Sequence, residues 1–234
     1  MKEETVVVNG FSITLPIGLA YNPKERRDDY ASYLTPDKGL KDVRHHLLAL
    51  TTLLAPQVSP KTKHVLHMFG GLGATAQVIH QIAPKAEHTF WERSESCCKY
   101  LSDEWDNVHH VEDSFKFMKE VDMAKFDVII FDPSLGSILS PGVLEFWDHI
   151  SKFHPYLIFV SDMATSKLHL NGKAYARVFG VETWNADDYA EAYDIYLRSL
   201  GKRIIGGIRD KFEMYFVVGK KSATKLKHPI TLLE

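Results

Sequence analysis

The strongest structural signal in this chain is the segment His64-Val-Leu-His-Met-Phe-Gly-Gly-Leu-Gly-Ala-Thr75. Its first half is a short apolar run typical of a buried strand, and three glycines follow that run. The next apolar residues repeat at the spacing of one helical face: Ala76, Ile79, Ile82 and Ala83. Glycines between a strand and a helix let a ligand approach the backbone and reach the unpaired N–H groups of the helix N-terminus. The stretch therefore predicts a binding site.

An acidic residue follows this turn at a sequence separation that is typical of nucleoside-binding proteins. Glu92 ends the run Glu87–Glu92 and lies 19 residues after Gly73. An acid about 20 residues past a glycine turn typically binds ribose hydroxyls. The spacing therefore predicts a nucleoside-containing cofactor lying across the first two strands. The alternative is an ordinary tight turn in a doubly wound sheet, with an exposed glutamate.

Further strands follow the glycine strand Val65–Phe69, and helical patterns separate them. After a second strand that ends at Glu92, the strands predicted are Val108–Val111, Phe126–Phe131 and Tyr156–Val160. Alternating strands and helices indicate a parallel sheet with right-handed crossovers. Ligands of such sheets bind outside the carboxyl ends of the strands, where an acidic residue is predicted after four of them: Glu92, Asp113, Asp132 and Asp162.

The helices carry recognisable boundary signals. Ser94 suits the N-cap of the helix after the second strand. Asn185 begins a later helix, and Gly201 follows its end, which is typical of a helix stop. The segments Arg203–Ile208 and Met214–Val218 then read as an antiparallel hairpin that closes the sheet.

The N-terminal region is predicted to add a hairpin and a helix. Asn9-Gly10 suits a type I′ turn between Thr5–Val8 and Phe11–Leu15, although the role of this hairpin stays open between extending a sheet edge, covering the site and joining two subunits. Thr35-Pro36 begins a helix whose apolar stripe is Leu40, Val43, Leu47 and Leu54. His45 and His46 lie on its other side, so we expect both on the surface.

The predicted fold class is thus α/β, a doubly wound, mostly parallel sheet with a C-terminal antiparallel hairpin, plus the N-terminal β-hairpin and helix. The predicted organisation is an N-terminal region (residues 1–60) packed on the core, a catalytic domain (61–221) and a basic tail (222–234). Two segments without clean periodicity, Pro16–Thr35 and Ala164–Trp184, are either the rim of a substrate pocket, because loops over a rigid sheet commonly carry binding groups, or ordinary surface connections.

Composition narrows the functional classes. The 234 residues are 45% hydrophobic with a formal net charge of −2, which gives no global electrostatic argument for nucleic acid. The only two cysteines, Cys97 and Cys98, are adjacent, so a reducing compartment fits better than a disulfide framework. No signal-peptide pattern or transmembrane run is present, so a cytoplasmic protein without a membrane partner is expected. The twelve histidines have no zinc-site spacing, and no metal is predicted.

On its glycines and the order of its acids, the region from Val65 to Gly219 resembles the class I S-adenosylmethionine-dependent methyltransferases. The resemblance implies that Phe69, Gly70, Gly71 and Gly73 wrap the methionine part of the cofactor. It implies that Glu92 binds the ribose, and that the adenine is flanked by Asp113, Ser114 and Phe115. Asp132 and Pro133 would face the transferred methyl group, which must lie in line with a nucleophile.

One position departs from the family. His67 stands where the family usually has an acid that holds the amino group of the cofactor. A neutral imidazole can accept a hydrogen bond from that amino group, so His67 stays among the predicted cofactor-binding residues.

A second resemblance concerns the methyl acceptor. Tyr33-Leu-Thr-Pro36 before the glycine strand and Asp132-Pro133 after the fourth strand are similar to motifs of amino-methylating nucleic-acid methyltransferases. In those enzymes an aromatic residue stacks on a flipped base. Here the run is Asp132-Pro-Ser-Leu135, without the second proline and the aromatic residue. An amino group of a nucleic-acid base is therefore one predicted acceptor, and the sequence does not identify it further.

Two other functions stay open. Gly71-Leu-Gly-Ala-Thr-Ala76 satisfies a dinucleotide fingerprint, so a nicotinamide-dependent oxidoreductase is the first alternative. Against it, the C-terminal hairpin is not a sixth parallel strand. A non-catalytic binding or structural protein is the second, because His67 and Ser134-Leu135 depart from the methyltransferase pattern and a fold does not fix a function.

Overall fold

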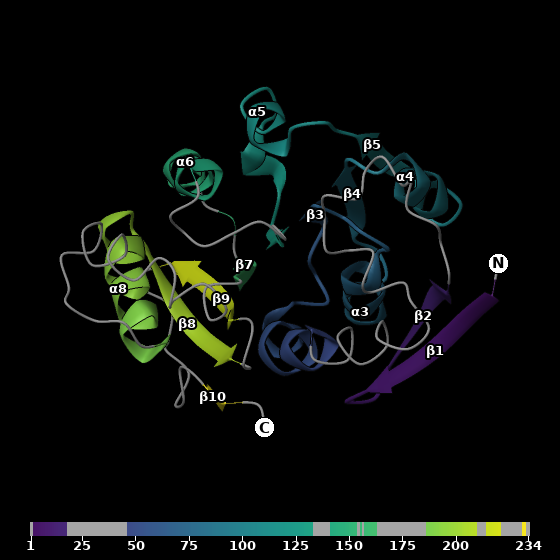
Figure 1. Ribbon diagram of the computed structural model, residues 1–234, viewed down its shortest axis with the longest axis horizontal. Coiled ribbons are helices and arrows are strands. Elements are labelled where there is room, and N and C mark those ends of the chain that lie inside the picture. The colour runs from purple at the N-terminus through teal and green to yellow at the C-terminus, as the bar shows by residue number, and fades with distance from the viewer. Residues whose placement is uncertain are drawn as a thin grey trace.

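The protein is built on one twisted sheet with helices on both faces (Figure 1). The computed structural model describes residues 2–17, 46–132, 141–153, 155, 157–162, 186–209, 214–220 and 231–232. The sheet has the order β10-β8-β9-β7-β6-β3-β4-β5. Its strands are β3 (His64–Met68), β4 (Glu87–Glu92), β5 (Asn107–His110), β6 (Val128–Phe131), β7 (Leu157–Asp162), β8 (Lys202–Arg209), β9 (Met214–Lys220) and β10 (Thr231–Leu232).

The strand directions confirm the predicted fold class. Strands β3 to β7 are paired in parallel, whereas β9 runs antiparallel between β7 and β8. The predicted C-terminal hairpin is therefore present, and its second strand is the one that lies beside the parallel strands. Residues Thr231–Leu232 of the predicted tail pair in parallel with β8 at the sheet edge.

Side chains at alternate positions of the strands pack into two hydrophobic cores. In β6, Ile129 and Phe131 enter one core with helices α6 (Pro141–Ile150) and α8 (Ala186–Ser199). The neighbouring Val128 and Ile130 enter the other core with α3 (Ala74–Ile82) and the N-terminal segments. Because both faces of the sheet are covered, the central strand β6 is apolar throughout.

The N-terminal hairpin forms a separate two-stranded sheet of β1 (Lys2–Val8) and β2 (Phe11–Ile17). Asn9 and Gly10 both have positive φ, of 49° and 84°, as the predicted type I′ turn requires. The hairpin packs on α3, where the Gln77 amide accepts from the Thr14 N–H and donates to the Thr14 carbonyl, both at 2.8 Å. It therefore does not extend the main sheet.

A helical segment leads from the hairpin region into the sheet. Residues 46–49 are helical and continue into a π-helical turn (Leu50–Leu54) and a 3-10 turn (Ala55–Gln57). Leu47 and Leu54 of the predicted apolar stripe are fully buried. The predicted start of this helix at Thr35-Pro36 lies outside the described residues.

Two predicted helix boundaries are also confirmed. Ser94 caps α4 (Glu95–Ser102) by accepting from the Cys97 N–H, and Gly201 follows α8 with a φ of 73°.

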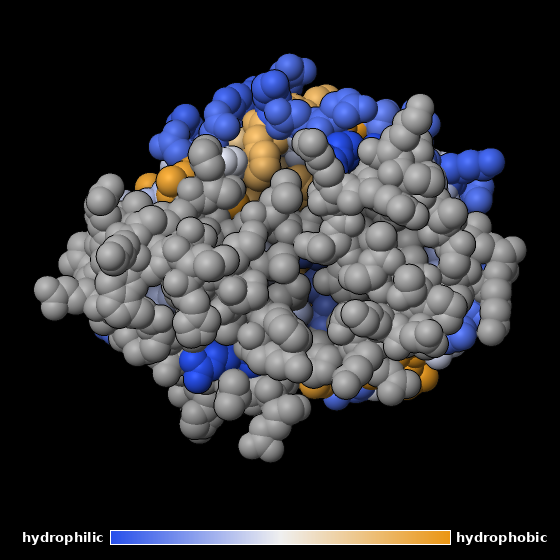
Figure 2. Space-filling model, in the orientation of Figure 1, coloured by the Kyte–Doolittle hydropathy of each residue, from blue (hydrophilic) through white to orange (hydrophobic). Residues whose placement is uncertain are grey.

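The surface of the described residues exposes few large hydrophobic side chains, which are Val7 and Ile195. In Figure 2 the coloured surface is mostly hydrophilic with small separate apolar areas. Among the described helices, none is long and apolar enough to cross a membrane.

Candidate functional site

The glycine turn after β3 has the backbone of a tight, strained connection. Phe69, Gly71 and Gly73 all have positive φ, of 64°, 53° and 74°. Glycine adopts this conformation readily, but for a bulky residue such as Phe69 it is an outlier of the kind that accumulates at functional sites. Gly73 is the N-cap of α3, so the helix begins directly after the turn.

Neighbouring side chains fill the space behind this turn. A Cβ atom on Gly70 would lie 2.9 Å from Cδ1 of Phe90, and one on Gly73 would lie 2.9 Å from Cδ2 of Leu101. The Gly70 N–H donates to the Trp91 carbonyl at 3.0 Å, which fixes the turn to β4. These contacts hold the backbone in place and leave no room for larger residues.

Glu92 closes the turn from the end of β4. Its Oε2 accepts from the Gly71 N–H at 2.7 Å, and its Oε1 accepts from the Ser94 N–H at 2.8 Å. Only 6% of the residue is exposed, so it is not the exposed glutamate expected for an ordinary tight turn. The two features predicted from spacing, the glycines and the acid, therefore meet at the carboxyl edge of the sheet.

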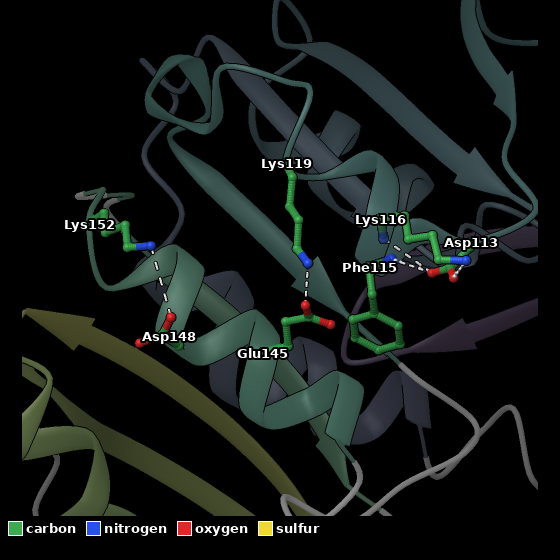
Figure 3. A network of polar contacts seen from close by, with 7 residues as sticks. All are labelled: Asp113, Phe115, Lys116, Lys119, Glu145, Asp148 and Lys152. Atoms are coloured by element: carbon green, nitrogen blue, oxygen red, sulfur yellow. Dashed lines mark hydrogen bonds and ion pairs between the residues drawn. The ribbon is translucent and has the colours of Figure 1, made fainter.

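Asp113 begins α5 (Ser114–Phe117) at the end of the neighbouring strand β5. Its Oδ1 accepts from the N–H groups of Phe115 and Lys116, both at 3.1 Å, and Oδ2 lies 3.4 Å from Nζ of Lys116 (Figure 3). Desolvation raises the pKa of Asp113, but the hydrogen bonds from Lys116 and Phe115 and the charge of Lys116 outweigh it and leave that pKa below its usual value. Ser114 is buried.

Phe115 joins an aromatic group at the same edge. Its ring centroid lies 5.6 Å from that of Phe69 and 6.2 Å from that of Phe131. A Cβ atom on Gly142 would lie 2.7 Å from the Phe115 ring, so this glycine lets α6 approach the ring closely. Figure 3 shows this junction of α5 with α6, which the ion pair of Lys119 with Glu145 also spans.

His67 points away from this aromatic group. Its Nε2 lies 2.9 Å from Nδ1 of His88, and its ring stacks on Phe90 with centroids 4.6 Å apart. Desolvation by burial and the nearby His88 lower the pKa of His67 well below its usual value. The His67 imidazole is therefore neutral at physiological pH and is held in a buried cluster of β3 and β4.

Asp132 follows β6 and has an unexpected neighbour. Nε2 of His46 lies 3.9 Å from Oδ2 of Asp132, and the two side chains are 15% and 24% exposed. The His46 ring packs edge-on against Phe159 of β7 and Tyr215 of β9, with centroids 5.8 Å and 5.7 Å away. The expectation of a surface histidine is wrong for His46, because the helical segment packs on the sheet with this side chain inward.

Other predicted site features fall where the structure gives no detail. Pro133 and Ser134-Leu135 lie outside the described residues, as does nearly all of the two predicted rim segments. The side chain of Asp162, the last residue of β7, is also outside them. In the described ranges, no group of three or more His, Cys, Asp or Glu side chains is arranged to hold a metal ion.

Comparisons with known proteins point to one fold. No protein-family model and no curated protein match the sequence. Trm1 from Pyrococcus horikoshii, solved in complex with S-adenosyl-L-methionine, is similar with a TM-score of 0.55 and 16% identity over 92% of this chain and 61% of Trm1. The protein yhhF from Escherichia coli is similar with a TM-score of 0.50 and 14% identity over 94% of this chain and 100% of yhhF.

An O-methyltransferase family protein from Burkholderia thailandensis gives a TM-score of 0.49 and 12% identity, over 84% of this chain and 64% of that protein. The chain thus spans less than two thirds of the length of both Trm1 and the Burkholderia protein. Together with the strand order, the likenesses to Trm1 and yhhF show that the chain has the class I methyltransferase fold.

Proposed function

We propose that the protein is an S-adenosylmethionine-dependent methyltransferase. The observation that carries the proposal is the hydrogen bond from the Gly71 N–H to the buried carboxylate of Glu92, which joins the glycine turn to the acid at the carboxyl edge of the sheet. In an open α/β sheet this edge, outside the carboxyl ends of the strands, is where ligands bind.

The residues present fit the cofactor. The turn Phe69–Gly73 would hold the methionine part. Two of its glycines adopt positive φ and none of them has a side chain, so a ligand can approach the backbone closely. Glu92 would accept from the ribose hydroxyls. A carboxylate has about four acceptor positions, so two backbone N–H groups can orient it and still allow a ligand hydroxyl to bind. Asp113, Ser114 and Phe115 would flank the adenine from the end of β5.

The bound cofactor would supply an activated methyl group on a sulfonium. The chain's own task is then to orient a nucleophile at that group, and Asp132 is the proposed residue, because its carboxylate can accept from an amine. Pro133, next in the chain, would shape the backbone there. An amino group of a nucleic-acid base is one acceptor that Asp132-Pro133 favours, on the motif resemblance alone.

The nicotinamide alternative receives less support. A dinucleotide-binding sheet of the doubly wound kind continues with a sixth parallel strand, whereas β9 runs antiparallel beside β7. A non-catalytic binding role is the second candidate, and one observation favours it. His67 bonds to His88, so the residue that stands at the family's acidic position is directed to a structural partner.

Calorimetry with S-adenosylhomocysteine and with NAD tests the proposal. We expect binding of the former only, and loss of binding in Gly71→Val, because a branched side chain at a φ of 53° disrupts the turn. Glu92→Ala should weaken binding by ~1.5–3 kcal/mol, the range for hydrogen bonds to charged groups.

Glu87→Ala is the matched control, because Glu87 is an exposed glutamate at the opposite end of the same strand. Urea denaturation of each variant separates loss of the site from loss of the fold. NAD binding in place of S-adenosylhomocysteine would establish the dehydrogenase alternative. Binding of neither ligand would contradict the proposal and favour the non-catalytic role.

A further inference from the structure

His46 and Asp132 come from distant parts of the chain and meet beside the end of β6. Their closest atoms, Nε2 and Oδ2, are 3.9 Å apart, which is too long for a direct hydrogen bond. A single nitrogen or oxygen atom of a ligand can lie about 2.8 Å from both, with an angle of about 90° at that atom. The pair is therefore spaced to share one polar atom.

The His46 ring is fixed by the sheet. It meets Phe159 edge-on with an interplanar angle of 89° and Tyr215 with an angle of 72°. Those rings belong to two neighbouring strands, β7 and β9, so they set the direction of the imidazole independently of Asp132. Among the described residues, the titratable groups in contact with His46 are Asp132 and the phenol of Tyr215.

We infer that His46 is the general base of the proposed methyl transfer, and that the acceptor is a neutral amino group, one of whose protons passes to Nε2 of His46. This inference rests on the proposed function. The acceptor's lone pair forms the new bond to the methyl carbon, and the electron pair of the broken carbon–sulfur bond stays on sulfur. The acceptor's proton goes to the imidazole, and the Asp132 carboxylate stabilises the imidazolium.

Histidine suits this step because the unprotonated nitrogen of a neutral imidazole can accept a proton. Asp132 then has two tasks: it accepts from the second hydrogen of the amino group, and it compensates the charge that develops on His46. An acceptor that is already an anion needs neither task. The pair therefore selects a polar acceptor that carries a proton.

The first experiment uses methyl-labelled S-adenosylmethionine and the pool of RNA, DNA, protein or metabolites that the wild type labels. His46→Gln keeps a polar side chain but removes the base, and should lower the labelling rate about 10²–10⁴-fold, the usual contribution of general base catalysis. Its affinity for S-adenosylhomocysteine should stay within about twofold, since His46 is not among the residues proposed to hold the cofactor.

His64→Gln is the matched control. His64 also pairs with a carboxylate, Glu87, at 3.2 Å, but it does so at the amino end of β3. It should keep the wild-type rate. The rate of the wild type should also fall on the acid side as one group is protonated, and this limb should be lost in His46→Gln. A His46→Gln variant with the wild-type rate and the same acid limb overturns the inference while leaving the methyltransferase proposal intact.

The second experiment does not require turnover. The imidazole NMR signals of His46, assigned with His46→Gln, should shift in Asp132→Asn, because Oδ2 of Asp132 lies 3.9 Å from Nε2 of His46. Unchanged His46 signals would show that the two side chains do not interact, and the inference would fail. If the wild type binds no S-adenosylhomocysteine and labels no pool, the proposed function and this inference fall together.

Discussion

The buried pair of His67 and His88 should make the fold sensitive to acid. The rings come from adjacent strands, share a hydrogen bond of 2.9 Å and are 2% and 4% exposed. Nε2 of His88 is buried and has no hydrogen-bond partner among the described residues. Desolvation, with a smaller contribution from His80, lowers the pKa of His88 from 6.5 to about 4. Charging either ring would place a cation in an aromatic cluster.

The sign and the size follow from proton linkage. Between pH 6.5 and 4 the unfolded chain binds the proton of His88 and the folded chain does not, so stability rises with pH in this window. The contribution is fully present above the unfolded pKa and is lost as the pH falls. Between pH 7.5 and pH 5, the two pKa values give a loss of about 2 kcal/mol from His88. His67 acts in the same direction, because its pKa is also lowered.

Urea denaturation at both pH values measures this loss. The double variant His67→Leu/His88→Phe removes both titrating rings, so its free energy of unfolding should fall by at least about 2 kcal/mol less than that of the wild type over the same interval. His110→Gln, which removes an exposed histidine of β5, should keep the wild-type loss. If the double variant loses as much stability as the wild type, the buried pair is not the origin of the acid sensitivity.

Two further predictions concern the frame around the site. Gly73→Ala and Gly201→Ala share the strain of a positive φ, of 74° and 73°, but only the first places a Cβ atom 2.9 Å from Leu101. In urea denaturation Gly73→Ala should therefore lower the free energy of unfolding by ~1–3 kcal/mol more than Gly201→Ala, and equal losses would show that the Leu101 side chain moves aside at no cost. Gln77→Ala removes both hydrogen bonds to Thr14 and should lower the free energy of unfolding by ~1–3 kcal/mol, and retention of wild-type stability would mean that water replaces the amide.

The parallel sheet and the meeting of the glycine turn with Glu92 were both predictable from the sequence. Both follow from local rules, because alternating strands and helices fix a parallel order and adjacent parallel strands end at the same edge. The αL turn residues at Asn9-Gly10 and Gly201 were predictable for the same reason, since their conformation depends on the residues themselves.

The partner of His67 required the register between strands. Val65 pairs with His88 and His67 pairs with Phe90, so the two histidines are diagonal neighbours on one face. A shift of one residue would turn His88 to the other face, and spacing along the chain does not fix that register. The departure at His67 was visible in the sequence, whereas its buried partner was not.

The position of His46 and the pairing of β9 depend on how the elements pack together and were not predictable from local patterns. Helical periodicity assigns a residue to a face of its own helix, but the way in which the helix packs on the sheet decides what that face meets, and here it meets Phe159 and Tyr215. Either strand of the C-terminal hairpin could satisfy the hydrogen bonds of β7. The choice of β9 agrees with the packing, because β9 contributes more buried side chains to the two cores than β8 does, and this is a property of the whole packed sheet.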